Sequence, residues 1–341
     1  MLVDCGSASP NNWSSIRAIT EVTGEDRFPQ RMRITVQQKS FLTFYTQPDR
    51  RFVLSLSFSR DRFFFTACDR AGLVNSFVYN IHRDALVLLR ILVGLMFCPE
   101  RQIGYDDSMW RGPDGNIIAI TVNGEEYTVI KKIFSSETVR GRATQCWLVR
   151  RDGRTYILKD SWCISSRPSE SYMLTRVFGI DHVPHLYGSE DLMSGAVPDS
   201  TTARRVGIND AEDRVHRRLV MGLVADCLHT FTSKKELIQA FIDVITGAYS
   251  SLSNNLYCAY LIALSFAAHQ VICDTKQILH RDISTNNIML YHPNPPSIFV
   301  PITQLRRGLL IDFDYATQFN SQGLSDTHRT VSHSSCRIGN K

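Results

Sequence analysis

The chain has 341 residues, of which 43% are hydrophobic and 21% charged, a balance typical of a globular protein with a substantial core. The net charge is only +5, and the arginines stand in scattered pairs instead of one basic stretch interleaved with aromatics, which argues against nucleic acid as a partner. Nine cysteines form no CxxC or Cys/His ligand pattern, so we expect buried, reduced thiols in an intracellular protein.

The beginning of the chain, MLVDCGSASPNN, has no basic region followed by an apolar run, so no signal peptide is expected. Two apolar stretches, Ala85 to Cys98 and Leu256 to Cys273, fall short of the roughly 20 mostly apolar residues that a membrane span needs. We therefore predict buried helices there and no association with a membrane. The sequence does not distinguish cytoplasm from nucleus.

Residues 1–33 look like a polar leader with little periodicity, and a small α+β domain without apparent chemistry is predicted over 34–115. A helix is expected over Asp84 to Cys98, with Asp84 as its N-cap. Hydrophobic alternation predicts three strands in this domain: Phe52 to Phe58, Arg62 to Cys68 and Ser76 to Tyr79.

Residues 116–228 form a strand-rich block, in which the dipeptides Asn123-Gly124 and Asp152-Gly153 mark the turns of two β-hairpins. Beyond Ser233 the pattern becomes helical up to His280, and 229–330 is predicted to be the second lobe, which is incomplete. Strands followed by helices indicate an α+β, two-lobed fold. The further elements expected are strands at Asn116 to Val122, Glu126 to Phe134, Gln145 to Arg150, Thr155 to Trp162 and Val215 to Val224, a helix at Ser169 to Phe178 and a polar loop at 190–213.

The chemistry is concentrated in His280-Arg281-Asp282, followed five residues later by Asn287. This pattern matches the H-R-D-x-x-x-x-N catalytic loop of phosphoryl-transfer enzymes. In that interpretation Asp282 orients the attacking hydroxyl and accepts its proton. Asn287 turns its amide oxygen toward Mg²⁺.

A second motif follows in the order that the mechanism demands. Leu309, Leu310 and Ile311 form an apolar strand that ends at Asp312, which is the geometry of the metal-binding aspartate in kinases. Asp312 is therefore predicted to be the main Mg²⁺ carboxylate. Each motif supports the interpretation of the other.

Three further residues complete the predicted site. Lys159 ends a strand after a hairpin, where a lysine that contacts the ATP phosphates is expected, and Glu170 begins a helix and is predicted to pair with it. The phosphate-binding loop is the weakest element, because the stretch 139–144 has one glycine, Gly141, where a typical kinase has three. Its backbone N–H groups could still approach phosphates, with Arg142 adding charge.

These pieces resemble the fungal-type protein kinase domain family. The resemblance rests on RRFVLSLSF, FVYNIHRDA, GRATQCWLVR, YILKDSW, RVHRRLV, ILHRDISTNNIML and LLIDFDYA, which extend from about Arg50 to Thr330. It implies a bilobal kinase-like fold and transfer of phosphate from ATP, with Mg²⁺, to a serine or threonine of a protein substrate. It assigns the roles above to Lys159, Glu170, Asp282, Asn287 and Asp312.

Three departures from the family pattern affect what we expect. Ala143 stands where the family tends to have a second loop glycine, and residues 247–266 resemble an insertion into the helix before the catalytic loop. After Thr330 the family continues into a substrate-binding segment and helices, whereas residues 331–341 diverge. The helical lobe is thus expected to be truncated, and the chain weakly active or inactive, because a misplacement of about 1 Å can cost a hundredfold in rate.

Two other functions compete with a protein kinase. One is a pseudokinase or nucleotide-binding interaction module. The other is a small-molecule kinase of the aminoglycoside or choline type, in which Asp314 would fit because those enzymes lack the glycine of the D-F-G motif. The oligomeric state cannot be inferred from the sequence.

Overall fold

The computed structural model describes residues 2–3, 13–24, 30–205, 207–208, 212–246, 272, 276–293 and 306–318. The chain divides into two compact units, one made of residues 1–167 and 188–220, the other of residues 168–187 and 221–341. In the described ranges the fold is α+β, as predicted, and it contains many strands and few helices. The domain boundaries expected from the sequence stay predictions.

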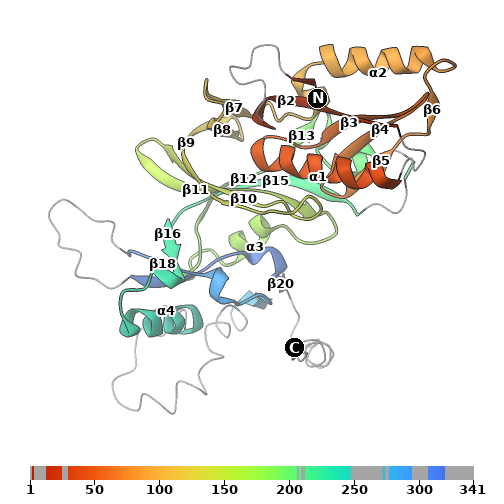
Figure 1. Ribbon diagram of the computed structural model, residues 1–341. Helices are drawn as coiled ribbons and strands as arrows, with labels where there is room; N and C mark the ends of the chain where they lie inside the picture. Colours follow the sequence, from red (N-terminus) through yellow and green to blue (C-terminus); the bar gives the residue numbers. More distant parts are fainter. Residues whose placement is uncertain are drawn as a thin grey trace, which may run out of the picture. The chain divides into compact units, whose positions relative to one another are not determined.

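A six-stranded sheet in the first unit has the order β1-β2-β3-β4-β5, with β6 also paired to β4 (Figure 1). Strands β2 and β3 are parallel, and α1 (Gln30–Thr46) makes the crossover that a parallel pair requires. Its strands are β1 (Leu2–Val3), β2 (Ile16–Thr23), β3 (Val53–Ser59), β4 (Arg62–Asp69), β5 (Gly72–Asn75) and β6 (Tyr79–Asn80).

The strand β2 lies within the stretch expected to be a polar leader. Its Ile16, Ala18 and Ile19 are buried, and β2 pairs with β3 along five residues. Sequence analysis does not predict this strand, because polar residues, among them Arg17 and Glu21, interrupt its apolar pattern. This part of the chain therefore belongs to the sheet.

The two helices of this unit pack on different hydrophobic clusters of the sheet. Helix α1 contributes Phe44 to the cluster around Ile16 and Ile19. Helix α2 (Ala85–Phe97) contributes Leu95 to a cluster with Leu56 and Phe63. Because neighbouring strand residues point to opposite faces, each helix covers its own face, as Figure 1 shows.

Helix α2 confirms the prediction, but its N-cap differs from the expectation. Asp84 occupies the cap position without a side-chain cap hydrogen bond; its carboxylate accepts the N–H of Asn80 instead. Of the strand expected over Ser76 to Tyr79, only Tyr79 lies in a strand, at the start of β6. β5 ends at Asn75, and Phe77 is 85% exposed. The side-chain hydroxyl of Ser76 accepts the backbone N–H of Phe65 and so takes the place of a backbone acceptor in the ladder.

The second sheet of the first unit has the order β12-β15-β11-β10-β9-β8-β7 (Figure 1). Both predicted hairpins are confirmed. In each turn the two central residues have positive φ, 52° and 76° at Asn123-Gly124 and 48° and 73° at Asp152-Gly153, as type I′ turns require. The strands are β7 (Met109–Arg111), β8 (Ile117–Val122), β9 (Glu125–Ser135), β10 (Gln145–Arg151), β11 (Arg154–Ile164), β12 (Leu186–Asp191) and β15 (Arg214–Met221).

Short elements lie between the strands of the two sheets of this unit. They are η1 (Trp13–Ser15), η2 (Glu100–Ile103), η3 (Thr202–Arg204), β13 (Met193–Ser194) and β14 (Val197–Pro198). One pair of them, β13 and β14, forms a hairpin inside 190–213, the stretch expected to be a polar loop. The turn after η2 needs a glycine. Gly104 has φ 109°, and a Cβ there would lie 2.0 Å from the carbonyl oxygen of Phe52.

The second unit contains a three-stranded antiparallel sheet, β16-β18-β19, and a two-stranded pair, β17-β20. Helix α4 packs on β18 and β19. The elements are α3 (Glu170–Arg176), β16 (Ala225–Cys227), η4 (Leu228–Thr230), α4 (Lys234–Thr246), β17 (Ile278–Leu279), η5 (Thr285–Asn287), β18 (Ile288–Tyr291), β19 (Arg307–Leu310), η6 (Phe313–Tyr315) and β20 (Thr317–Gln318).

In the part of the chain that the structure describes, no helix has the length and apolarity needed to cross a membrane. The stretch expected to be inserted, 247–266, and most of the apolar stretch Leu256 to Cys273 lie outside the described residues. Five cysteines in the described ranges form no disulfide. Cys68 is buried as expected, whereas Cys227 is exposed.

Candidate active site

A buried histidine, His280, holds the loop that carries Asp282 in place. Nδ1 of His280 accepts the backbone N–H of Asp282 at 3.3 Å, and its Nε2 lies 3.1 Å from the carbonyl oxygen of Ile311. Since a carbonyl only accepts, the proton of the ring is on Nε2. The ring also meets Phe313 edge-on, with 4.7 Å between centroids. His280 thus joins the predicted catalytic loop to the predicted metal strand.

Asn287 is fixed in one orientation by Asp282. Its side-chain nitrogen donates to the backbone oxygen of Asp282 at 2.7 Å and to Oδ2 of the same residue at 3.1 Å. Because the backbone oxygen is only an acceptor, the amide cannot be flipped. No hydrogen bond to Oδ1 of Asn287 is found in the described ranges, so this oxygen is free to bind a cation.

The backbone brings the two motifs side by side. Strands β18 and β19 are antiparallel, with Ile288 opposite Leu310. One step further on, the N–H of Ile311 donates to the carbonyl oxygen of Asn287 at 2.9 Å. Asp312 therefore follows directly after a residue that is paired with Asn287.

Asp312 lies in a sparsely populated backbone conformation. Its φ and ψ are 65° and 71°, and Arg281 in the catalytic loop has φ 68°. Left-handed conformations of residues other than glycine cost energy and gather at functional sites. The strain is consistent with a constraint on where the Asp312 carboxylate must point.

The carboxylate of Asp312 has two acidic neighbours. One ligand oxygen each of Glu170, Asp312 and Asp314 lie within 4.8 Å of one another. Oε1 of Glu170 also accepts the backbone N–H of Phe313 at 3.1 Å. Sequence reasoning predicts only a lysine partner for Glu170 and no metal-ligand role for Asp314. The position of Asp314, two residues after Asp312, is the signal that could indicate such a role.

Glu170 is held at the start of helix α3. The hydroxyl of Ser169 caps this helix by accepting the N–H of Tyr172 at 3.1 Å. A carboxylate in the first helical turn is favoured by the helix dipole, and Glu170 is 4% exposed. The cap explains how a buried acidic side chain is positioned here.

The donor set of this cluster fits a hard divalent cation. Mg²⁺ prefers carboxylate and amide oxygens, and the second unit offers both, from Asp312 and Asn287, on adjacent backbone. Three carboxylates this close repel one another, and a cation relieves that repulsion. The chemistry of these residues therefore fits a hard divalent cation such as Mg²⁺.

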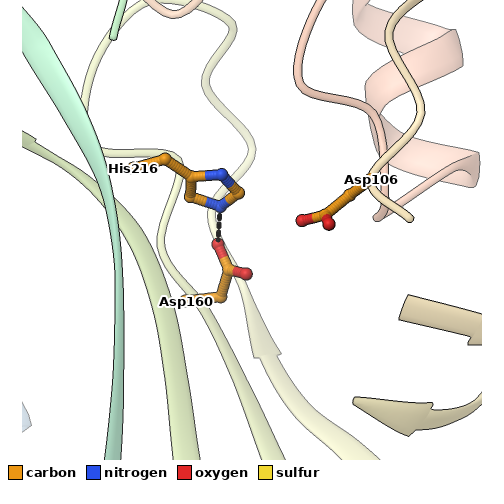
Figure 2. Close-up of side chains that lie close together, drawn as sticks. All are labelled: Asp106, Asp160 and His216. Atoms are coloured by element: carbon orange, nitrogen blue, oxygen red, sulfur yellow. Dashed lines mark hydrogen bonds and ion pairs between the residues drawn. The ribbon is translucent and has the colours of Figure 1, made fainter. Parts of the chain in front are cut away.

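A second acidic group, in the first unit, has the opposite character. Figure 2 shows Asp106, Asp160 and His216 converging, with a hydrogen bond of 2.6 Å between Asp160 and Nε2 of His216. The fully buried Arg218 donates to Oδ2 of Asp160 at 2.7 Å and to Oδ2 of Asp106 at 2.6 Å. Because the guanidinium already supplies the positive charge, this group is a buried ion-pair network and not a metal site.

The network also sets the charge of His216. Burial by itself lowers the pKa of this imidazole, but the carboxylates of Asp160, Asp199 and Asp106 raise it to about 9. The ring stacks on Trp162, with 4.5 Å between centroids and an interplanar angle of 10°, which favours the protonated form. His216 is accordingly a buried cation at neutral pH.

The remaining two predicted residues, Lys159 and Gly141, belong to the first unit. Lys159 lies on β11 opposite Cys146 and is 5% exposed. The N–H of Gly141 donates to the carbonyl oxygen of Arg70 at 3.0 Å, so this N–H is not available to a phosphate in the conformation described. The structure brings together Glu170, Asp282, Asn287 and Asp312; the pairing of Lys159 with Glu170 stays a prediction.

Comparison with known proteins identifies the family of the chain. The family model described as fungal protein kinase matches residues 4–213, 205–258 and 258–339. The chain belongs to the fungal protein kinase family, and it is a kinase-type enzyme by membership. Two of the matched segments meet at residue 258, inside the stretch expected to be inserted. No curated protein matches the chain significantly.

Proposed function

We propose that this chain binds Mg²⁺–ATP and transfers the γ-phosphate to a serine or threonine hydroxyl of a protein substrate. The observation that carries the proposal is the orientation of Asn287, whose Oδ1 is left open to a cation while its backbone pairs with Ile311, next to Asp312. Bound Mg²⁺ would neutralise charge on the phosphates.

The residues of the second unit then take distinct roles. Asp282, half-buried and pinned by Asn287 and His280, orients the substrate hydroxyl and receives its proton as the oxygen bonds to the γ-phosphorus. The bond from that phosphorus to the bridging oxygen breaks, and ADP leaves. Asp312 and Asn287 hold the cation. Glu170 anchors the backbone of Phe313 and so the strand end that carries Asp312.

The test separates metal binding from chemistry. Calorimetry would compare ATP binding, with and without Mg²⁺, for the wild-type chain and Asp312→Asn. The exposed Asp181 provides a matched control, Asp181→Asn. We expect Asp312→Asn to lose the Mg²⁺-dependent part of the affinity and the control to keep it. Equal Mg²⁺–ATP affinity in all three chains would refute the metal assignment.

Transfer is measured in parallel with radiolabelled ATP. Asp282→Asn should bind Mg²⁺–ATP like the wild type but transfer phosphate at least about a hundredfold more slowly, which is the usual contribution of a positioned acid or base. Binding without any transfer in the wild-type chain would instead support the pseudokinase alternative.

A small-molecule kinase is the other candidate, and the position of Asp314 favours it. Asp314 replaces the glycine of the D-F-G motif and contributes to the carboxylate cluster. The acceptor screen should therefore include serine/threonine peptides, tyrosine peptides, an aminoglycoside and choline. Phosphate found on the small alcohols and on no peptide would reject the protein-kinase proposal.

A further inference from the structure

Both oxygens of the Asp160 carboxylate are held by one neighbouring strand. His216 and Arg218 are alternate residues of β15, the strand next to β11, so their side chains lie on the same face of the sheet. Nε2 of His216 donates to Oδ1 of Asp160 at 2.6 Å, and Nε of Arg218 donates to Oδ2 at 2.7 Å. All three side chains are buried. The carboxylate therefore cannot rotate without breaking a charge-assisted hydrogen bond.

The ring of His216 has a carboxylate at each nitrogen. Its Nδ1 lies 3.3 Å from Oδ2 of Asp199, while its Nε2 faces Asp160. Since an ionised carboxylate only accepts, both ring nitrogens carry a proton when both contacts are hydrogen bonds. The same ring stacks on Trp162, which follows Asp160 by two residues on β11. The imidazolium thus links β11 to the segment that carries Asp199.

Two ion pairs continue this network to the segment that leads into the six-stranded sheet. Nη2 of Arg218 donates to Oδ2 of Asp106 at 2.6 Å, and the backbone N–H of Asp106 donates to the carbonyl oxygen of Asp49 at 2.9 Å. Nη1 of Arg51 lies 3.3 Å from Oδ1 of Asp199. Asp49 and Arg51 come just before β3. The network therefore connects β11 to a sheet for which no chemistry is predicted.

Lys159 lies directly before Asp160 on β11. Successive side chains of a strand point to opposite faces, so Lys159 lies on the face opposite the network. The two residues pair in regular register with Cys146 and Gln145 of β10, and Nε2 of Gln145 donates to the carbonyl oxygen of Pro48, again just before β3, at 2.8 Å. A shift of Asp160 would move the backbone of Lys159, because a planar peptide bond joins them.

The same part of β11 also holds the predicted phosphate-binding loop, residues 139–144. The backbone N–H of Trp162 donates to the carbonyl oxygen of Arg142 at 2.7 Å. Within the loop, the N–H of Gly141 donates to the carbonyl oxygen of Arg70, which directly follows β4. The loop is thus held by β11 on one side and by the six-stranded sheet on the other.

We propose that the six-stranded sheet is a fixed support for the phosphate-binding elements of this chain, and that Asp160 is the positioning residue for Lys159. This inference rests on the proposed function, in which Lys159 contacts the ATP phosphates. A lysine ammonium is a compact charge on a flexible stem, so its place at the phosphates depends on how firmly its backbone is held. The hydrogen bonds to Asp160 hold that backbone from the opposite face. A displacement of about 1 Å can cost about a hundredfold in rate.

The test is a double-mutant cycle of Asp160→Asn and Lys159→Ala. Calorimetry measures the affinity for Mg²⁺–ATP, and radiolabelled ATP measures transfer in chains that are active. Asp160→Asn keeps the size of the side chain but removes its charge, and it should lower the affinity at least about tenfold when Lys159 is present. In the Lys159→Ala chain it should lower the affinity by less than about twofold, since residues that act through one another are not additive. A merely structural role would give equal losses in both backgrounds.

Asp191→Asn is the matched control. Asp191 accepts a hydrogen bond from Nε of Arg217 at 3.0 Å, so it also contacts β15. Arg217 stands between His216 and Arg218 and therefore points to the opposite face of the strand, and the side chain of Asp191 is 52% exposed. This substitution should leave the affinity for Mg²⁺–ATP unchanged in both backgrounds.

Circular dichroism and urea unfolding establish whether each variant is folded. If Asp160→Asn does not fold, Asp106→Asn takes its place in the cycle. It leaves both hydrogen bonds to Asp160 intact but removes the charge of the other carboxylate that Arg218 contacts, and it should show the same dependence on Lys159 with a smaller loss. Equal losses in the two backgrounds, or no loss when Lys159 is present, would overturn this inference and leave the proposed function standing. A wild-type chain that binds no nucleotide would overturn both.

Discussion

The side-chain nitrogen of Asn287 lies 2.7 Å from the backbone oxygen of Asp282 and 3.1 Å from its Oδ2. The amide nitrogen of Asn287 thus orients Asp282, the residue expected to accept the substrate proton. The amide oxygen, Oδ1, accepts no hydrogen bond from the described residues. Under the proposed function, the positioning of Asp282 and the binding of the cation would both depend on this one side chain, so it is an informative residue to change.

Asn287→Ala should lower the affinity for Mg²⁺–ATP at least about tenfold, since loss of metal ligands or of the groups that orient them typically costs 10–100-fold. The affinity for ATP without Mg²⁺ should not change. Titration calorimetry with and without the metal measures both. A loss of equal size in the two conditions would mean that Asn287 acts on the fold and not on the cation.

Gly308→Ala should destabilise the second unit. A Cβ at this position would lie 2.2 Å from the carbonyl oxygen of Ala240 in α4, so the helix must move away from β19. Overpacking costs about 1–3 kcal/mol, and more where the backbone itself is hit. Urea unfolding followed by circular dichroism measures the change.

Gly94→Ala is the matched comparison for this prediction. Gly94 lies inside α2, and a Cβ there would meet only Sγ of Cys98, at 3.9 Å. Alanine should stabilise this helix by up to about 1 kcal/mol. Equal effects of the two substitutions would contradict the close approach of α4 to β19.

Stability should fall as the pH rises from about 6.5 to about 9, because His216 binds its proton more tightly in the folded chain. Asp160 and its acidic neighbours raise the pKa of His216 to about 9, against about 6.5 in an unfolded chain. This contribution is complete below the unfolded pKa and is lost as the pH passes the folded one. It amounts to at most about 3 kcal/mol.

Unfolding free energies measured across this pH range test the point. His216→Gln should give a flatter profile, since the titrating group is gone. A wild-type profile that is flat, or that rises with pH, would show that His216 is neutral in the fold.

Arg218→Met should destabilise the first unit by about 3–5 kcal/mol, the usual cost of removing one partner from a buried charge network. The two aspartates that Arg218 contacts would be left buried without their guanidinium. Arg150→Met, at an exposed position of β10, should change stability by no more than about 0.5 kcal/mol. A similar small change at Arg218 would mean that the network contributes little.

The sequence by itself determined those features whose cause is local. Asn-Gly and Asp-Gly predicted both hairpins because few residues adopt positive φ, and hydrophobic alternation located β3 and β4 within a residue or two. The spacing from Asp282 to Asn287 and the apolar stretch before Asp312 led to the proposed chemistry, which stays a prediction, because chain order and residue type carry that signal.

The tertiary structure alone decided which distant groups meet. No local pattern could show that the ring of His280 meets the carbonyl oxygen of Ile311, that the carboxylate of Glu170 lies beside Asp314, or that Arg70 is buried without an ion pair. Hydrogen bonds, charge compensation and desolvation depend on residues tens to hundreds of positions apart. They come into being only when the strands that carry them pair.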